Sequence, residues 1–280
     1  MSINKTTKKE TMIKKLFLLE WSKFSKNTVI NLLTTFFFIF LPTSLYFGKY
    51  LKDVSGKLNL NVNILEAPLI WDYLGYAGNW IVFFFLGVLV IYTITIDVAN
   101  KTMRQNIITG LSKKEYFISK FLIVLFYSFL ATLYYSLLSV SVAWFNTADF
   151  NLSALLDNET AIPRFWLMSF AYLNFAMFLA FLFRKSGIAV FVYLTYMIIA
   201  EPLLKLLIQK YVMDNKYINY LPMNTAEDLM PAPIAKMAAN LTGSTGSDVF
   251  LEYGEASILT VIYAALFLAL TYFSFLRRDL

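Results

Sequence analysis

The sequence contains no cysteine and no histidine. The chain therefore cannot form a disulfide, and it lacks the usual ligands of structural zinc and of haem. Catalysis by a Cys–His or Ser–His pair is excluded for the same reason. Charge is also scarce, because Asp, Glu, Lys and Arg together make up only 15% of the 280 residues. A soluble domain is about one quarter charged, so this chain has too few charges to cover a surface that faces water.

Motifs that carry catalysis in other proteins are also missing. The sequence has no G-x-x-x-x-G-K-[ST] phosphate-binding loop and no G-x-S-x-G nucleophile turn, and H-E-x-x-H requires histidine. No two carboxylates lie together within the apolar segments, where they could exchange protons with a substrate. We therefore expect no enzyme activity, cofactor site or metal site in this chain.

Apolar and aromatic residues are abundant instead, at 59% and 18% of the chain, with a mean hydropathy of +0.61. A helix needs about 20 apolar residues to cross the hydrocarbon layer of a membrane. Five of the six charge-free windows reach or approach that length, and the fifth window in chain order is shorter. The sequence thus predicts an all-α, polytopic membrane protein, with one transmembrane domain over residues 1–280. The six windows are 27–48, 73–96, 121–148, 165–183, 186–200 and 256–276.

The short fifth window is followed directly by Glu201 and Pro202. An acidic residue at membrane depth is costly, so it is a candidate for function. Proline removes a helical hydrogen bond and disfavours the α conformation of the residue before it. Glu201 could therefore lie in a proton or substrate path. Alternatively the fifth span ends here, and Pro202 begins a re-entrant or interfacial helix. The short window favours the second interpretation.

The distribution of charge predicts how the chain is oriented. Most of the 24 Lys and Arg residues lie before the first window, in the connection 97–120, at 184–185 and near the C-terminus, while most of the 18 acidic residues lie on the opposite side. Basic connections stay in the cytoplasm. We therefore expect both termini in the cytoplasm and a long extracytoplasmic loop at 209–255. The net charge of +6 follows this orientation and does not indicate nucleic-acid binding.

Residues 1–28 are expected to form a cytoplasmic arm with an interfacial helix. Between residues 12 and 26 the apolar side chains Ile13, Phe17, Trp21 and Phe24 recur at helical spacing, and lysines occupy the other positions. Such a helix would lie in the membrane surface with its lysines near anionic headgroups. A simple extension of the first span is the alternative.

The connection 97–120 reads DVANKTMRQNIITGLSKKEYFISK. Gly110 suits a helix C-terminus because it adopts positive φ without strain. Ser112 and Glu115 fit the capping box that begins a helix. The segment thus predicts a short helix at about 100–109, a glycine turn and a new helix entering the membrane. It is either a docking element for a soluble partner or an ordinary solvated hairpin.

This connection resembles the coupling loop in permease subunits of ABC-2 type ABC transporters. The resemblance rests on Asp97, Thr102, Arg104, Gly110, Ser112, Lys113 and Lys120, although the family usually has Glu at the first of these positions and Arg at the sixth. The C-terminal ending Arg277-Arg278-Asp279-Leu280 also resembles the family, as does, more weakly, the segment Tyr220-Leu221-Pro222 before the last span. The resemblance covers the whole chain in outline, through its six spans, interfacial helix and long last outer loop.

The resemblance implies a permease of the cell (inner) membrane, with export as the expected direction. It would form a homodimer or heterodimer in the lipid bilayer and bind separate ATPase subunits, which hold ATP and Mg. The residues implied in ATPase coupling are Asp97, Thr102, Arg104, Gln105, Asn106, Ile108, Gly110, Ser112 and Lys113. The alternative is a multi-span membrane protein that acts without ATP, as a channel, membrane enzyme or assembly factor.

The orientation can be tested by single-cysteine labelling, since the chain has no native cysteine. We expect that Asn100→Cys is not labelled by an impermeant maleimide in intact cells and is labelled after permeabilisation. Asn240→Cys, in the predicted outer loop, is the control and should be labelled in both. Labelling of Asn100→Cys from outside intact cells would contradict the predicted topology.

Overall fold

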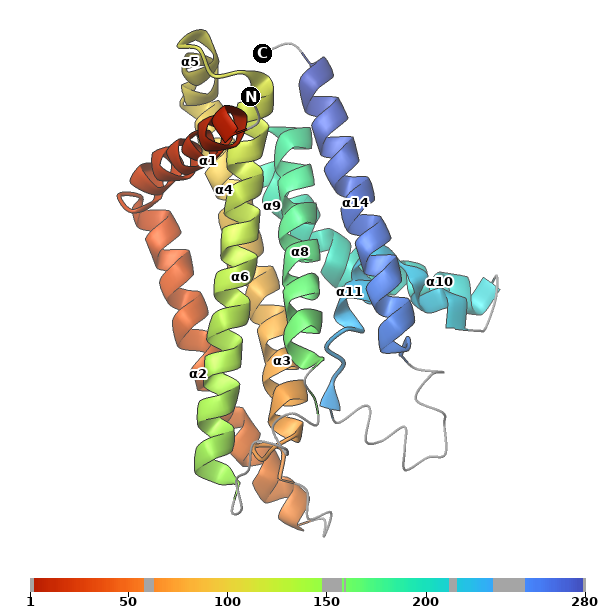
Figure 1. Ribbon diagram of the computed structural model, residues 1–280. Helices are drawn as coiled ribbons and strands as arrows, with labels where there is room; N and C mark the ends of the chain where they lie inside the picture. Colours follow the sequence, from red (N-terminus) through yellow and green to blue (C-terminus); the bar gives the residue numbers. More distant parts are fainter. Residues whose placement is uncertain are drawn as a thin grey trace.

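Helices make up all the regular secondary structure in the part of the chain that the computed structural model describes, which is residues 3–57, 63–147, 158, 160–211, 216–233 and 250–278 (Figure 1). Here η1 and η2 are π-helices and η3 is a 3₁₀ helix. The elements in chain order are α1 (Ile3–Phe24), α2 (Thr28–Lys57), α3 (Leu69–Ile81), η1 (Val82–Gly87), α4 (Val88–Ala99), α5 (Thr102–Ile108), α6 (Lys113–Asn146), α8 (Ala161–Phe183), α9 (Ser186–Thr195), η2 (Tyr196–Ala200), α10 (Glu201–Tyr211), η3 (Lys216–Tyr220), α11 (Pro222–Glu227) and α14 (Tyr253–Arg277).

Six helical segments are long and apolar enough to cross a membrane, which confirms the predicted all-α, polytopic class. Each overlaps one of the six charge-free windows. Two of the segments join several elements, because α3, η1 and α4 form one continuous helix, as do α9, η2 and α10. The segments are Thr28–Tyr50, Leu69–Ala99, Lys113–Asn146, Ala161–Phe183, Ser186–Tyr211 and Tyr253–Arg277.

Helix α8 lies at the centre of the bundle and packs against α4, α6, α9 and α14 (Figure 1). Lipid tails are as apolar as leucine, so close packing and hydrogen bonds between helices must hold a membrane bundle together. Small buried residues on α8, among them Ala171, Ala176 and Ala180, allow this close approach. Asn174 adds a hydrogen bond from its Nδ2 to the carbonyl of Ala264 on α14, at 2.6 Å.

The π-helix η1 in the second span meets α9 through an aromatic pair. The buried ring of Tyr193 stacks on Phe83 of η1, with ring centroids 4.6 Å apart. A Cβ atom on Gly87 would lie only 2.1 Å from the Tyr193 hydroxyl, so the absent side chain makes room for the tyrosine. Because a π-turn contains one residue more than an α-turn, it shifts the side chains that follow.

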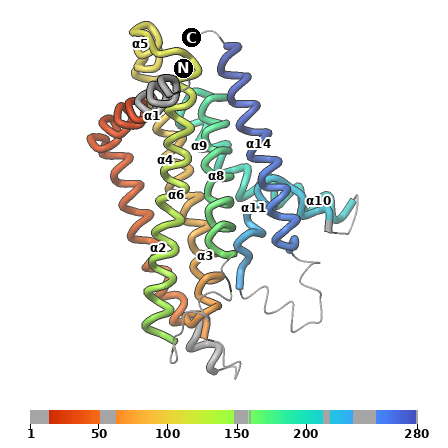
Figure 2. Tube along the Cα trace, viewed as in Figure 1, coloured from red at the N-terminus to blue at the C-terminus, as the bar shows by residue number. Residues whose placement is uncertain are grey.

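Both chain termini lie at the same end of the bundle as α5 (Figure 2). Six spans require this arrangement, and we refer to this end as the cytoplasmic end, following the charge distribution. Asp279 and Leu280, which contribute to the resemblance, lie outside the described residues. Much of the predicted outer loop 209–255, including 212–215 and 234–249, also lies outside them.

Helix α1 crosses the bundle at this end and packs against α6 (Figure 1). A helix lies where the interfacial helix is predicted, but it begins at Ile3, and its buried residues match the predicted apolar set only in part. Leu16, Glu20 and Phe24 are buried against the bundle, while Trp21 is 47% exposed. The apolar face indicated by the spacing therefore faces the bundle only in part. Glu20, an acidic residue, lies in the middle of the contact between α1 and α6.

The chain does not leave the helical conformation at Pro202. Glu201 has φ −69° and ψ −45°, so the expectation that the proline would disfavour its α conformation is wrong. The π-helix Tyr196–Ala200 directly precedes Glu201 and widens the turn in which the proline ring would otherwise meet a carbonyl. Helix α10 then extends sideways from the bundle (Figure 1). A second helix therefore does follow the short fifth window, but without a break in the backbone.

Candidate functional site

The connection between α4 and α6 contains the predicted short helix, α5, which extends from Thr102 to Ile108. Gly110 ends it with φ +115°. Its N–H donates to the carbonyl of Ile107 at 3.2 Å, and the N–H of Leu111 donates to that of Asn106 at 2.9 Å. These two bonds form a Schellman motif, which satisfies the last carbonyls of the helix. The predicted role of Gly110 in ending the helix is confirmed.

The predicted capping box at the start of α6 is also present. The N–H of Glu115 donates to Oγ of Ser112 at 3.2 Å, and the N–H of Ser112 donates to Oε2 of Glu115 at 2.7 Å. Two amide groups that would lack a helical partner are therefore satisfied. The capping box therefore fixes the start of α6 and, with it, the length of the turn that separates α5 from α6.

Helix α5 lies at the cytoplasmic end of the molecule (Figure 2), and its exposed side chains are both polar and apolar. Arg104, Gln105 and Ile108 are exposed, Asn106 is half-buried, and Ile108 is 82% exposed. Met103 is buried and Ile107 packs against the core, so they anchor the other face. An exposed isoleucine next to polar side chains at the end of a rigid support can dock into a groove of another protein.

A buried cluster of four charged residues lies between α1 and the two helices, α4 and α6, that α5 connects. Lys120 of α6 lies 2.6 Å from Oδ2 of Asp97 on α4 and 2.8 Å from Oε2 of Glu20 on α1. Lys23, one turn after Glu20, lies 3.3 Å from Asp97 and 3.6 Å from Glu20. Lys120, Glu20 and Asp97 are almost completely buried, and Lys23 forms the partly exposed edge. The cluster is electrically neutral and joins three helices.

Two hydroxyl groups also lie beside the carboxylates. Ser119 Oγ lies 3.1 Å from Glu20 Oε1 and 2.8 Å from the carbonyl of Tyr116, so these two acceptors share its one proton. Tyr116 Oη donates to Asp97 Oδ2 at 3.3 Å. Removing one partner of such a buried ion pair is strongly destabilising. The cluster therefore fixes the relative positions of α1, α4 and α6 at the point where α5 begins.

The structure places three further residues of the sequence-predicted set. Asp97 lies at the C-terminal end of α4 and pairs with lysines. Lys113 donates from Nζ to the carbonyls of Leu276 and Arg278, at 3.4 and 2.8 Å. It therefore binds the end of the last span. Thr102 is the first residue of α5.

Glu20, Lys23, Tyr116 and Ser119 are the cluster residues that sequence reasoning missed. One signal was available, because Glu20 and Glu10 are the only acidic residues in an otherwise basic segment of 28 residues. Lys120, the partner of Glu20, is 100 residues away in sequence, so no local pattern could identify the pair.

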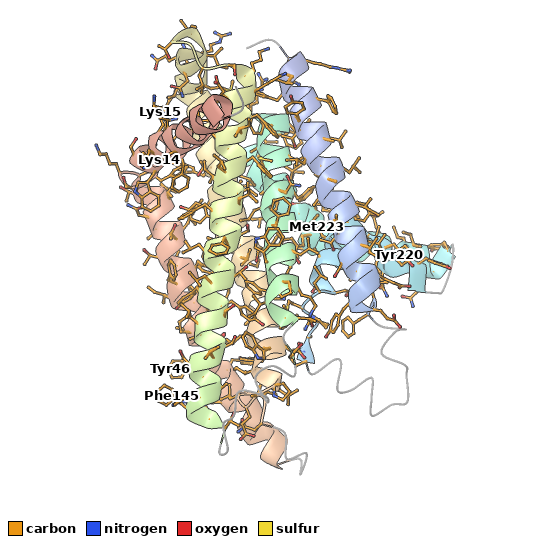
Figure 3. The ribbon with its side chains drawn as sticks, in the orientation of Figure 1. Lys14, Lys15, Tyr46, Phe145, Tyr220 and Met223 are labelled. Atoms are coloured by element: carbon orange, nitrogen blue, oxygen red, sulfur yellow. The ribbon has the colours of Figure 1, made fainter. Side chains whose placement is uncertain are left out.

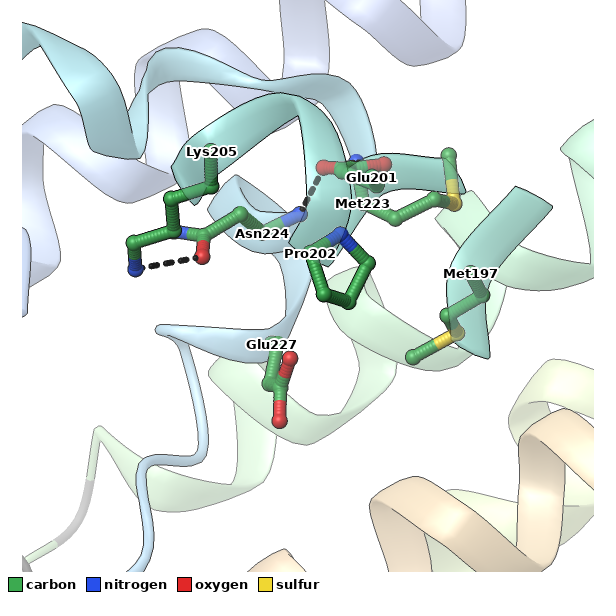
Figure 4. Close-up of a pocket in the computed structure, with 7 residues that line it drawn as sticks. All are labelled: Met197, Glu201, Pro202, Lys205, Met223, Asn224 and Glu227. Carbon is green, nitrogen blue, oxygen red and sulfur yellow. Dashed lines mark hydrogen bonds between the residues drawn. The ribbon is translucent and has the colours of Figure 1, made fainter. Parts of the chain in front are cut away.

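Glu201, on the outer side of the fifth span, binds the start of another helix (Figure 4). Its Oε1 accepts from the N–H of Met223 at 2.8 Å and from that of Asn224 at 2.6 Å. These amides belong to the first turn of α11, where they lack helical partners. Lys205 donates to Oδ1 of Asn224 at 3.1 Å. Glu201 is 4% exposed and lines a pocket of about 210 Å³.

The carboxyl of Asp228 ends the same short helix and is also buried. It accepts from the N–H of Leu251 at 3.0 Å and from Nδ2 of Asn224 at 3.1 Å. Burial raises the pKa of Asp228 to about 7. Asp228 and Glu201 thus hold α11 from both sides, and the arrangement gives Glu201 a structural role that does not require it to carry protons or substrate.

Arg164, in the first turn of α8, joins the elements around α11. It is 4% exposed and donates from Nη1 to the carbonyl of Leu229 at 2.9 Å. Its guanidinium lies 3.8 Å from the ring centroid of Tyr253 on α14. The outer ends of the fourth and sixth spans are therefore held to the segment that Glu201 and Asp228 organise.

A scan against models of protein families finds no match to this chain, and a search among curated proteins finds no relative.

We expect Lys120→Met to lower the free energy of unfolding by roughly 3–5 kcal/mol, because Glu20 and Asp97 would face each other without their main cation. The exposed Lys114 supplies a matched control, and Lys114→Met should change stability by less than about 0.5 kcal/mol. Unfolding in detergent solution, followed by near-ultraviolet circular dichroism, measures both. Adding Glu20→Gln and Asp97→Asn to Lys120→Met should recover part of the loss. Equal stability of the two single variants would show that the cluster does not hold the helices together.

Two substitutions at Glu201 distinguish a structural role from a required charge. Glu201→Gln keeps an oxygen that accepts from Met223 and Asn224, so we expect near-normal stability. Glu201→Ala leaves both buried amides unpaired, at roughly 1–3 kcal/mol each, and should speed their hydrogen exchange. Amide exchange at Met223 and Asn224, with unfolding in detergent, gives the comparison. Equal disruption by Gln and Ala would instead show that the negative charge is needed.

Proposed function

We propose that this chain is the permease subunit of an ABC-2 type transporter in the cell (inner) membrane, driven by ATP hydrolysis on a separate ATPase subunit. The observation that carries the proposal is α5, an exposed short helix with a fixed position at the cytoplasmic end of the bundle. Docking contacts concentrate in a few well-packed side chains. Ile108, Arg104 and Gln105 offer such a set.

The support beneath α5 is what makes it suited to coupling. A helix on a flexible hairpin would move without displacing the spans. Here both ends of α5 lead directly into spans that meet at Asp97 and Lys120, only 2.6 Å apart. Lys113, at the start of α6, also binds the end of α14. Movement of α5 against an ATPase would therefore reach the second, third and sixth spans.

Helix α1 supports a location in the membrane surface next to the ATPase. Lys14 and Lys15 are exposed on it (Figure 3), and the apolar Leu18 and Leu19 are exposed as well. Lysines beside apolar side chains suit the boundary between anionic headgroups and acyl chains. In the proposed complex the permease forms a homodimer or heterodimer, exports its substrate, and leaves ATP and Mg to the partner.

Reversing the exposed face of α5 tests the proposal. We expect the double variant Arg104→Glu, Ile108→Asp to insert into the membrane normally but to lose its ATPase. One carboxylate would replace the Arg104 cation, and a second would bring an unpaired charge to the place of the apolar Ile108. Such losses amount to roughly 2–5 kcal/mol where the contact is buried. The measurement is pull-down of the ATPase encoded beside the gene, with ATP hydrolysis by the reconstituted complex.

The matched control is Lys114→Glu, which reverses an exposed charge at the same end of the molecule. It should keep the ATPase and its activity. If the double variant also retained both, α5 would be a solvated hairpin, and a membrane protein that acts without ATP would become the better explanation.

A further inference from the structure

A groove of about 400 Å³ lies between α2 and α6, near the ends of these helices opposite to α5. Tyr46 and Phe145 form its two rims and lie beside each other in Figure 3. The groove exists because hydrogen bonds hold α2 to α3, and hold the end of α6 to the segment that precedes α3. Tyr73 Oη donates to the carbonyl of Ser44 at 2.5 Å, and the N–H of Ala67 donates to Thr147 Oγ1 at 3.2 Å.

The depth of the groove follows from the length of α2. Lys49 lies 21 residues after Thr28, or about 32 Å along the helix, and the hydrocarbon layer is about 30 Å thick. The lysine is therefore at the outer boundary of this layer, and Pro42 lies about 10 Å deeper. Exposed aromatic side chains mark the same boundary, as they do in other membrane proteins. They are Tyr46, Tyr50, Trp144 and Phe145.

The polarity of the lining changes with this depth. Pro42, Leu45 and Val142 form an apolar inner part, whereas Lys49 stands at the rim. The hydroxyls of Thr43 and Ser141 donate to carbonyls of their own helices. The Lys49 amine lies 6.0 Å from the ring centroid of Tyr46. Among the side chains that the structure describes, which do not include those of residues 51–62, no carboxylate lies within ion-pair distance of it. The groove thus combines one available cation with an apolar floor.

We propose that this groove binds one anionic phospholipid of the outer leaflet. Its phosphate lies at Lys49, between the interfacial aromatic rings, and an acyl chain follows the apolar lining toward Pro42. The charge of the rim selects an anionic headgroup, and the apolar interior selects a lipid over a free phosphate ion. This inference does not depend on the transport proposal, because it concerns a face remote from α5.

The test is native mass spectrometry of the delipidated full chain in detergent, titrated separately with phosphatidylglycerol and phosphatidylcholine. Wild-type protein should bind the first phosphatidylglycerol about fivefold more tightly than phosphatidylcholine, as expected for one lysine near an anionic headgroup. Lys49→Gln should remove this preference. Lys210→Gln is the matched control, since Lys210 is also exposed and lies over a tyrosine ring, 5.1 Å from the centroid of Tyr211, but outside the groove. It should keep the preference.

Ser141→Trp fills the groove from an exposed position and should prevent tight binding of both lipids. Glycerol phosphate should not displace the bound lipid in wild type. Three results would overturn the proposal: an unchanged preference in Lys49→Gln, an equal loss in Lys210→Gln, or a Ser141→Trp protein that binds lipid normally. A Ser141→Trp variant that changes its oligomeric mass while keeping its lipid would assign the groove to contact between copies of the chain.

Discussion

The ion pairs of Lys120 with Asp97 and Glu20 are the interactions on which the cytoplasmic half of the molecule depends. Charges taken out of water are costly, and only close pairing with complete hydrogen bonding repays that cost. The geometry is therefore narrow, and any shift between α1, α4 and α6 would expose an uncompensated charge. Helix α5 begins and ends on two of these helices. Its position is consequently set by the cluster, although α5 itself has only seven residues.

The same principle operates around α11, with the backbone as partner. Glu201 and Asp228 are buried carboxyls, and both accept from amide groups around α11. Arg164 adds bonds between the fourth span, the α11 segment and α14. Polar groups thus fix the end of the bundle near α5 and the segment around α11, whereas close packing holds the helices around α8. In a membrane, where apolar contacts between helices gain little over contacts with lipid, this division is expected.

The sequence allowed the spans, the end of α5 at Gly110 and the capping box at Ser112 to be predicted, because each depends on neighbouring residues. Charge scarcity defines the spans, and helix ends follow from one or two side chains. Glu20 could not be matched with Lys120 in this way, since their contact depends on how α1 crosses α6. The helical conformation at Glu201 was also unpredictable, because a π-helix accommodates Pro202 and has no comparable signature. The contact of Lys113 with Leu276 also depends on the fold, since 163 residues separate the two in sequence.

The central claim is that the buried cluster fixes α5 relative to the bundle, and a distance measurement tests it most directly. Spin labels can be placed on Leu18→Cys and Ile108→Cys, two exposed positions on α1 and α5 of a chain without native cysteine. Double electron–electron resonance then measures the distance between the two labels. Dilution with unlabelled protein restricts the signal to distances within one chain. The account predicts a narrow distance distribution that broadens when Lys120→Met is added and stays narrow with Lys114→Met. A broad distribution in the otherwise unaltered chain, or one that Lys120→Met leaves unchanged, would contradict it.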